Sequence, residues 1–104
     1  MGEYRVCISD SAKQDIRAIA AYIKHELQEP AIAEKTTVAI LDAIFTLEEI
    51  PMRIALVRDD RLAEKQIRSI QAKNYSAFFR IHESMKTVEI IRVLYSRRDW
   101  AALL

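Results

Sequence analysis

The C-terminal part of the chain contains the stretch Ile90-Ile91-Arg92-Val93-Leu94-Tyr95-Ser96-Arg97-Arg98-Asp99-Trp100. Its first half is rich in β-branched and aromatic residues, a composition typical of a strand in a sheet. Two guanidinium groups then stand side by side, and such groups are not buried cheaply without partners. The stretch therefore predicts a sheet strand that delivers Arg97 and Arg98 to the surface, where they contact an anionic partner.

Charge is distributed unevenly along the chain. Residues 1–64 carry eight Lys or Arg against twelve Asp or Glu, a net charge of −4, whereas residues 65–98 carry eight against two, a net charge of +6. The overall charge of +1 hides this asymmetry. A basic C-terminal part predicts an acidic partner or target.

Length and composition predict one globular domain over residues 1–104. Hydrophobic residues make up 51% of the chain and charged residues 30%, which argues against disorder. No apolar run approaches the length of roughly 18–20 residues that spans a membrane, so we expect a cytoplasmic protein with no membrane partner.

Several chemistries are excluded by missing residues. The only glycine is Gly2, so the chain has no glycine-rich phosphate loop of the P-loop or dinucleotide type. The single cysteine, Cys7, rules out an intramolecular disulfide, and His25 and His82 are the only histidines. These are too few of the usual ligands for a structural zinc site, and we predict no metal and no cofactor.

The first half of the chain predicts a strand followed by two helices. Residues 4–9 alternate as a strand does, and Ser9-Asp10-Ser11 then supplies a helix cap, with Gln14 completing a capping box with Ser11. The first helix carries one apolar stripe, and the second is expected to run from Pro30 to about Ile50, where Pro51 ends it. The two helices should form an antiparallel hairpin. The stripe positions are Ala12, Ile16, Ile19, Ala20, Ile23 and Leu27 in the first helix and Ala33, Thr37, Ile40, Leu41, Ile44 and Leu47 in the second.

The second half predicts a long connection and three strands. Residues 51–65 are the hardest to assign and are expected to form a long connection that apolar anchors pin to the core. Strands are predicted over residues 66–72, 75–83 and 87–95, with Asn74 taking positive φ in the first turn. Consecutive strands joined by such short turns form an antiparallel meander. The anchors are Ile54, Leu56, Val57 and Leu62.

The middle strand has two different faces. Alternation puts Phe79 and Ile81 on one face and leaves Phe78, Arg80 and His82 on the other. A helix hairpin can cover only one side of a sheet, so the mixed face bearing Arg80 and His82 is a candidate binding surface.

With this order of elements, the sequence resembles the RelE/ParE superfamily of toxins from bacterial type II toxin–antitoxin systems. The resemblance covers nearly the whole chain. It rests on Tyr4-Arg5-Val6-x-Ile8-Ser9-x-x-Ala12-x-x-Asp15-Ile16, Pro51, Leu56-Val57-x-Asp59, Lys73-Asn74-Tyr75-x-x-Phe78-Phe79 and Ile91-Arg92-Val93-Leu94-Tyr95-x-Arg97-Arg98-Asp99-Trp100. It implies an α+β fold with two helices packed on one face of an antiparallel sheet. It also implies a growth inhibitor of the plasmid-stabilisation type, neutralised in a hetero-oligomer by a cognate antitoxin.

Members of this superfamily act in two ways, and the resemblance leaves both open. RelE-like members resemble metal-independent ribonucleases that cut mRNA in the ribosome, whereas ParE-like members inhibit DNA gyrase. The cleavage chemistry needs a proton acceptor, a leaving-group acid and positive charge on the phosphorane. If the chain is RelE-like, the catalytic candidates are Arg68, Lys73, Arg80, Tyr95 and Arg97, with His82 as an alternative proton-transfer group.

Two departures favour the ParE-like reading. RelE-like toxins place an arginine directly after the hairpin tyrosine, where this chain has Ser76, and their paired lysines have no clear match in Ile67-Arg68-Ser69-Ile70. The long hairpin and the Arg-Arg-Asp-Trp ending also look ParE-like. We therefore favour inhibition of a target such as gyrase. Ribosome-dependent cleavage, and a degenerate toxin that acts only in antitoxin binding and operon autoregulation, remain the alternatives.

The partner-binding candidates each have a structural alternative. They are Arg80, His82, Arg92, Arg97 and Arg98. His82 has a solvated side chain as its alternative, and Arg92, inside an apolar strand, has an ion pair. The structural alternative for Tyr95 is a packing residue whose hydroxyl reaches water or a carbonyl. Trp100 is expected to anchor the tail on the core.

Overall fold

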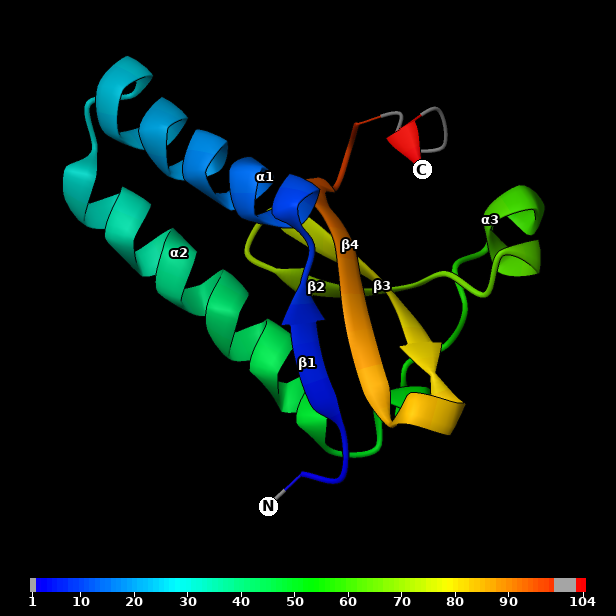
Figure 1. Cartoon of the computed structure of the whole chain (residues 1–104). Helices are drawn as coiled ribbons and strands as arrows, with labels where there is room; N and C mark the ends of the chain where they lie inside the picture. Colours follow the sequence, from blue (N-terminus) through cyan, green and yellow to red (C-terminus); the bar gives the residue numbers. More distant parts are fainter. Residues whose placement is uncertain (1, 99–102) are drawn as a thin grey trace.

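A computed structural model describes residues 2–98 and 103–104 (Figure 1). The predicted roles of Asp99 and Trp100 lie outside the described residues. A hairpin of two long helices covers one face of a four-stranded sheet, and a short helix lies on the other side. Within the described residues, no helix combines the length and the apolar content that a membrane span requires.

The sheet confirms the predicted meander and places the first strand. Strands β2 (Arg68–Ala72), β3 (Tyr75–His82) and β4 (Thr87–Tyr95) pair antiparallel in sequence order. Strand β1 (Arg5–Ile8) adds parallel to β4, giving the order β1-β4-β3-β2. The β3–β4 register shifts between Phe78 and Phe79, so the alternation of side chains along β4 is interrupted there.

The N-cap of helix α1 (Asp10–Ala21) lies two residues before the Ser11 of the predicted capping box. Ser9, not Ser11, is the N-cap, and its hydroxyl accepts the Ala12 N–H at 3.1 Å. The predicted capping box of Ser11 and Gln14 is therefore wrong, because Ser9 is already in the extended conformation that an N-cap takes. The helix continues as a π-helical turn, Tyr22–Glu26.

Helix α2 (Pro30–Phe45) starts at the predicted proline but ends five residues before the predicted Ile50. Two 3₁₀ turns follow, Thr46–Glu48 and Pro51–Arg53. Ile50 takes left-handed backbone angles. The residue before a proline is disfavoured in the right-handed helical region, which explains why the helix does not reach Pro51.

The main core lies between the helix hairpin and the sheet. Most positions of the two predicted stripes are buried, but Leu27 is exposed, and Thr36 is more deeply buried than Thr37. The buried cluster consists of Tyr4, Ala12, Ile16, Ile40, Ile44, Leu47, Ala77, Phe79, Val88, Ile90 and Val93.

The outer face of the sheet is more covered than the sequence predicts. Helix α3 (Asp60–Glu64), N-capped by Asp59, forms inside the long connection, for which the sequence predicts only apolar anchors. Its Leu62 packs with Ile67, Phe78 and Leu94 in a second buried cluster, against which Leu103 and Leu104 also pack. The expectation of an open mixed face is thus wrong around Phe78, and only the end with Arg80 and His82 stays half-buried.

The β2–β3 turn also differs in detail. Lys73, not Asn74, has positive φ, at 57°. A residue with a β-carbon is tolerated there because the position is a single turn residue at the surface. The turn still joins β2 to β3 as predicted, with Ala72 opposite Tyr75.

Candidate partner-binding site

A groove lies where the end of α1 passes the ends of β3 and β4. Register places Tyr75, the first residue of β3, opposite Tyr95, the last residue of β4. Their rings meet edge to face, with centroids 5.9 Å apart and planes at 74°. Tyr22, from the π-helical turn, lines the same groove. Three tyrosines from distant parts of the sequence therefore share one hollow of about 520 Å³.

The strand ends that carry the tyrosines are held together by hydrogen bonds. The Ser96 N–H donates to the Asn74 carbonyl at 2.8 Å, and the Ser76 and Ser96 hydroxyls lie 2.9 Å apart. Burial raises the pKa of Tyr75, and the neighbouring Tyr22 and Tyr95 raise it further. Tyr75 is therefore a neutral hydroxyl at physiological pH, able to donate or accept a hydrogen bond.

The groove is apolar and open to solvent. Tyr22 and Leu27 are each 53% exposed and Tyr95 is 43% exposed. A second hollow shares Leu27 and Tyr75 with the first and continues to the exposed Ile32. Contiguous exposed apolar surface of this kind marks binding sites on soluble proteins. Arg98 lines the groove and supplies one cationic group.

The five catalytic candidates fall into two groups. Lys73, Tyr95 and Arg97 lie at the groove end of the sheet, whereas Arg68 begins β2 at the other end. At 3.3 Å per strand residue, Arg68 and Lys73 are roughly 15 Å apart along the sheet. The Arg68 guanidinium donates to the Ile54 carbonyl, and Arg80 Nε donates to the Lys65 carbonyl at 3.0 Å. The fold therefore does not bring all five together.

Two of the partner-binding candidates contact carboxylates of this chain. Arg92 donates from Nε and Nη2 to the Asp15 carboxylate at 2.7 and 2.9 Å. This hydrogen bonding raises the pKa of Arg92 above its ordinary value. His82 Nε2 lies 2.9 Å from Glu89 Oε1 on the neighbouring strand. Arg97 and Arg98 are exposed, as the sequence predicts.

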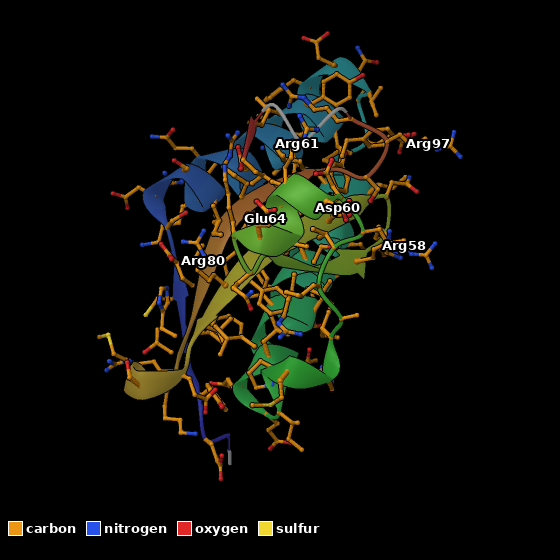
Figure 2. The ribbon with its side chains drawn as sticks, turned by 90° about the vertical axis from the view of Figure 1, so that its right-hand side faces the viewer. Arg58, Asp60, Arg61, Glu64, Arg80 and Arg97 are labelled. Atoms are coloured by element: carbon orange, nitrogen blue, oxygen red, sulfur yellow. The ribbon has the colours of Figure 1, made fainter. Side chains whose placement is uncertain are left out.

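The surface around α3 mixes both charges. Figure 2 shows Arg58 and Arg80 near α3, which itself carries Asp60, Arg61 and Glu64. Arg61 also pairs with Asp59 at 3.1 Å, and that hydrogen bond lowers the pKa of Asp59. Acidic residues from the first part of the chain thus lie beside the basic second part, so the +6 region is not a uniformly positive surface.

Among residues 2–98 and 103–104, no group of three or more His, Cys, Asp or Glu side chains could hold a metal ion. The groove residues that sequence reasoning missed are Tyr22, Leu27 and Tyr75. The available signal was Tyr22, a large aromatic residue that falls outside the predicted apolar stripe of the first helix.

Known proteins similar to this chain agree with the fold. The family model for the ParE toxin of the type II toxin–antitoxin system parDE matches residues 6–100. A chain of the chromosomal ParDE system from P. aeruginosa is similar over 89% of this chain and 96% of that chain, with 20% identity and a TM-score of 0.74. A chain of the RelBE2 toxin–antitoxin complex from Mycobacterium tuberculosis is similar over 88% and 96%, with 22% identity and a TM-score of 0.63. No curated protein matches by sequence.

Proposed function

Because this chain belongs to the ParE toxin family of type II toxin–antitoxin systems, we propose that it is neutralised by a cognate antitoxin that binds the tyrosine groove. The tyrosine groove is the hollow lined by Tyr22, Leu27, Tyr75, Tyr95 and Arg98. Freed from the antitoxin, the protein inhibits growth by binding its target, for which DNA gyrase is the favoured candidate.

The observation that carries antitoxin binding is the exposure of Tyr22, Leu27 and Tyr95 in one hollow. Large amphipathic rings give much contact area at a small cost in side-chain entropy. A segment that is disordered alone gains most from such a surface, because its apolar side chains become buried only on binding. Asp15 also lines the groove, but its carboxylate is paired with Arg92, so the cationic Arg98 favours a segment that also carries acidic residues.

Binding of the target, as opposed to RNA cleavage, is supported by the separation of the catalytic candidates. Arg68 and Arg80 are engaged with backbone carbonyls, away from Tyr95 and Arg97. Metal-independent cleavage would need positive charge and proton-transfer groups around one phosphate. Ribosome-dependent cleavage is therefore the second candidate function, and the groove-end residues Lys73, Tyr95 and Arg97 are the ones it would use.

One set of measurements separates these functions. Purified protein should inhibit DNA supercoiling by gyrase and should produce no codon-specific cuts by primer extension on translated mRNA. Tyr95→Phe should keep full toxicity, since the ring remains and only the hydroxyl is lost. Cuts on ribosome-bound mRNA that disappear in Tyr95→Phe would show that the protein is a nuclease and would overturn the proposal of gyrase inhibition. A protein that does neither but still binds its antitoxin would be the autoregulatory form.

The groove itself is tested by truncating its exposed rings. Tyr22→Ala and Tyr95→Ala should each weaken binding of the antitoxin encoded beside this gene by at least about tenfold, as expected for aromatic anchors. Met85→Ala removes a more exposed apolar side chain at the β3–β4 turn and should leave binding unchanged. Equal affinities for all three variants would place the antitoxin elsewhere.

A further inference from the structure

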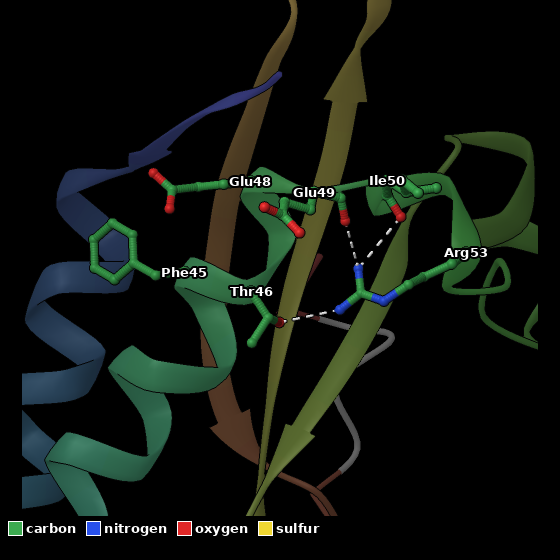
Figure 3. A pocket seen from close by; sticks show the side chains of 6 residues that line it. All are labelled: Phe45, Thr46, Glu48, Glu49, Ile50 and Arg53. Atoms are coloured by element: carbon green, nitrogen blue, oxygen red, sulfur yellow. Dashed lines mark hydrogen bonds between the residues drawn. The ribbon is translucent and has the colours of Figure 1, made fainter. Parts of the chain in front are cut away.

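The end of α2 forms a second exposed apolar site, at the turn that leads into the connection. A hollow of about 390 Å³ is lined by Phe45, Thr46, Glu48, Glu49, Ile50 and Arg53 (Figure 3). Phe45 is 45% exposed and Ile50 is 65% exposed. Neither side chain belongs to the two buried clusters. We call residues 45–53 the α2-end site.

Ile50 has an unfavourable backbone conformation for its residue type. Its φ and ψ are 44° and 60°, in the left-handed region. A β-branched residue there is a genuine outlier, whereas Gly or Asn adopts the region readily. Such strain persists where the surroundings impose it, and it clusters at functional sites. Both the conformation and the exposure of Ile50 therefore cost stability, and the interior gains nothing from its side chain.

The surroundings hold this conformation rigidly. The Arg53 guanidinium reaches back to donate to the carbonyls of Glu49 and Ile50, at 3.0 and 3.3 Å, and to the Thr46 hydroxyl at 3.1 Å (Figure 3). The Glu48 carbonyl accepts the Tyr4 N–H at 3.0 Å, which ties the turn to the start of β1. The site is thus preorganised, and preorganisation lowers the entropy lost on binding.

The N-terminal segment presses closely on the same turn. A β-carbon at Gly2 would lie 2.4 Å from both the β-carbon and the carbonyl oxygen of Glu48, so only glycine fits there. The only glycine of the chain is therefore placed against this turn. The close contact supports the view that the turn is held in one conformation.

The charges of the site identify its occupant. Glu48 is exposed beside Phe45 and Ile50, and Asp42 is exposed on the preceding turn of α2. The Arg53 guanidinium faces carbonyl oxygens in the turn. We infer that the α2-end site docks a segment of a second protein that presents an apolar side chain flanked by Lys or Arg.

This partner differs from the one expected at the tyrosine groove. Helix α2 spans Pro30–Phe45, and at 1.5 Å per residue its two ends are about 22 Å apart. The tyrosine groove lies beside the tip of the helix hairpin, whereas the α2-end site lies at the opposite end of α2. The ligand inferred for the α2-end site is apolar and basic, whereas Arg98 in the tyrosine groove favours an acidic segment. The two sites can be filled at the same time.

The direct test uses a short synthetic peptide of alternating leucine and lysine, titrated into the purified protein and followed by NMR of the backbone amides. The amides of residues 45–50, 52 and 53 should shift, and those of the tyrosine groove should not. A peptide with glutamate in place of lysine should bind at least about tenfold more weakly, a difference of about 1.4 kcal/mol. Shifts at the groove alone, no shifts at all, or equal binding of the two peptides would overturn the inference.

Two variants separate docking from folding. Ile50→Asn removes the apolar side chain, and asparagine suits the left-handed backbone. The variant should therefore keep or raise Tm, while its affinity for the lysine peptide falls at least about tenfold. Glu48→Lys reverses the charge at this position, so this variant should bind the glutamate peptide more tightly than the lysine peptide. Gln66→Gly relieves another positive φ, at 62°, away from the site and should not change peptide binding. If Ile50→Asn binds the lysine peptide like the parent protein, Ile50 is not a docking residue.

Discussion

Asp15 on α1 and Arg92 on β4 form a two-point ion pair across 77 positions of sequence, with N–O distances of 2.7 and 2.9 Å. The same carboxylate also accepts the Val93 N–H at 2.9 Å. Their side chains are only 14% and 25% exposed. One carboxylate therefore joins the first helix to the strand that precedes the Arg97-Arg98 pair.

Breaking this pair should destabilise the protein. Asp15→Ala leaves the Arg92 guanidinium and the Val93 N–H without their acceptor, and a hydrogen bond to a charged group contributes about 1.5–3 kcal/mol. Because the pair is not fully buried, we expect a loss of about 1–3 kcal/mol in urea unfolding. The exposed Asp42→Ala is the control. In a double-mutant cycle, Asp15→Ala with Arg92→Ala should be less destabilising than the sum of the two single variants.

Because α3 covers the outer face of the sheet, truncating Leu62 should strongly lower the free energy of unfolding. Leu62 is 1% exposed in the second buried cluster, so Leu62→Ala should lower the free energy of unfolding by about 2–5 kcal/mol. Leu27→Ala makes the same chemical change at an exposed position and should change stability by no more than about 0.5 kcal/mol. Guanidinium chloride unfolding measures both. Similar values would mean that α3 contributes little to stability.

Stability should fall in acid partly through Glu83. Hydrogen bonds from Lys86 and from the Tyr4 hydroxyl lower the pKa of Glu83 below its ordinary value of 4.5. The stabilisation from a carboxylate with a lowered pKa is complete above its unfolded-state pKa and is lost as pH falls through the folded-state value. Tm should therefore drop more steeply below about pH 4.5 in the parent protein than in Glu83→Gln. Parallel Tm curves would rule out this contribution.

Arg97 and Arg98 should matter for binding and not for folding. Both are exposed, so replacing both with alanine should shift stability by no more than about 0.5 kcal/mol per site. Charge at an interface mainly governs association rate, so the variant should bind the antitoxin or target more slowly, with a weaker dependence on salt. Arg5→Ala with Arg17→Ala removes the same charge from exposed positions elsewhere. Unfolding of the Arg97/Arg98 variant would assign the pair a structural role.

Local pattern was sufficient for most of the elements. The predicted boundaries of the last strand, residues 87–95, match β4, and Pro30 begins α2 as expected. These features depend on alternation, helical periodicity and the fixed φ of proline, which act between near neighbours. The helix end at Phe45, the choice of Ser9 over Ser11 as the N-cap and the positive φ of Lys73 were not predicted. For Ser9 the reason is a long-range contact, because its hydroxyl also donates to the Ile91 carbonyl on β4 at 2.9 Å, which local pattern does not reveal.

The sequence by itself determined the family resemblance, the α+β order of elements and the exposure of Arg97 and Arg98. Only the tertiary structure decided that Tyr22, Tyr75 and Tyr95 share a groove, that Arg92 is paired with Asp15 and that α3 covers Phe78. The tertiary structure also places Arg68 and Lys73 at opposite ends of β2, and it places acidic side chains of α3 beside basic residues of the second half of the chain. The physical reason is that periodicity assigns a side chain to a face of its own element, whereas a site depends on which faces and strand ends long-range packing brings together.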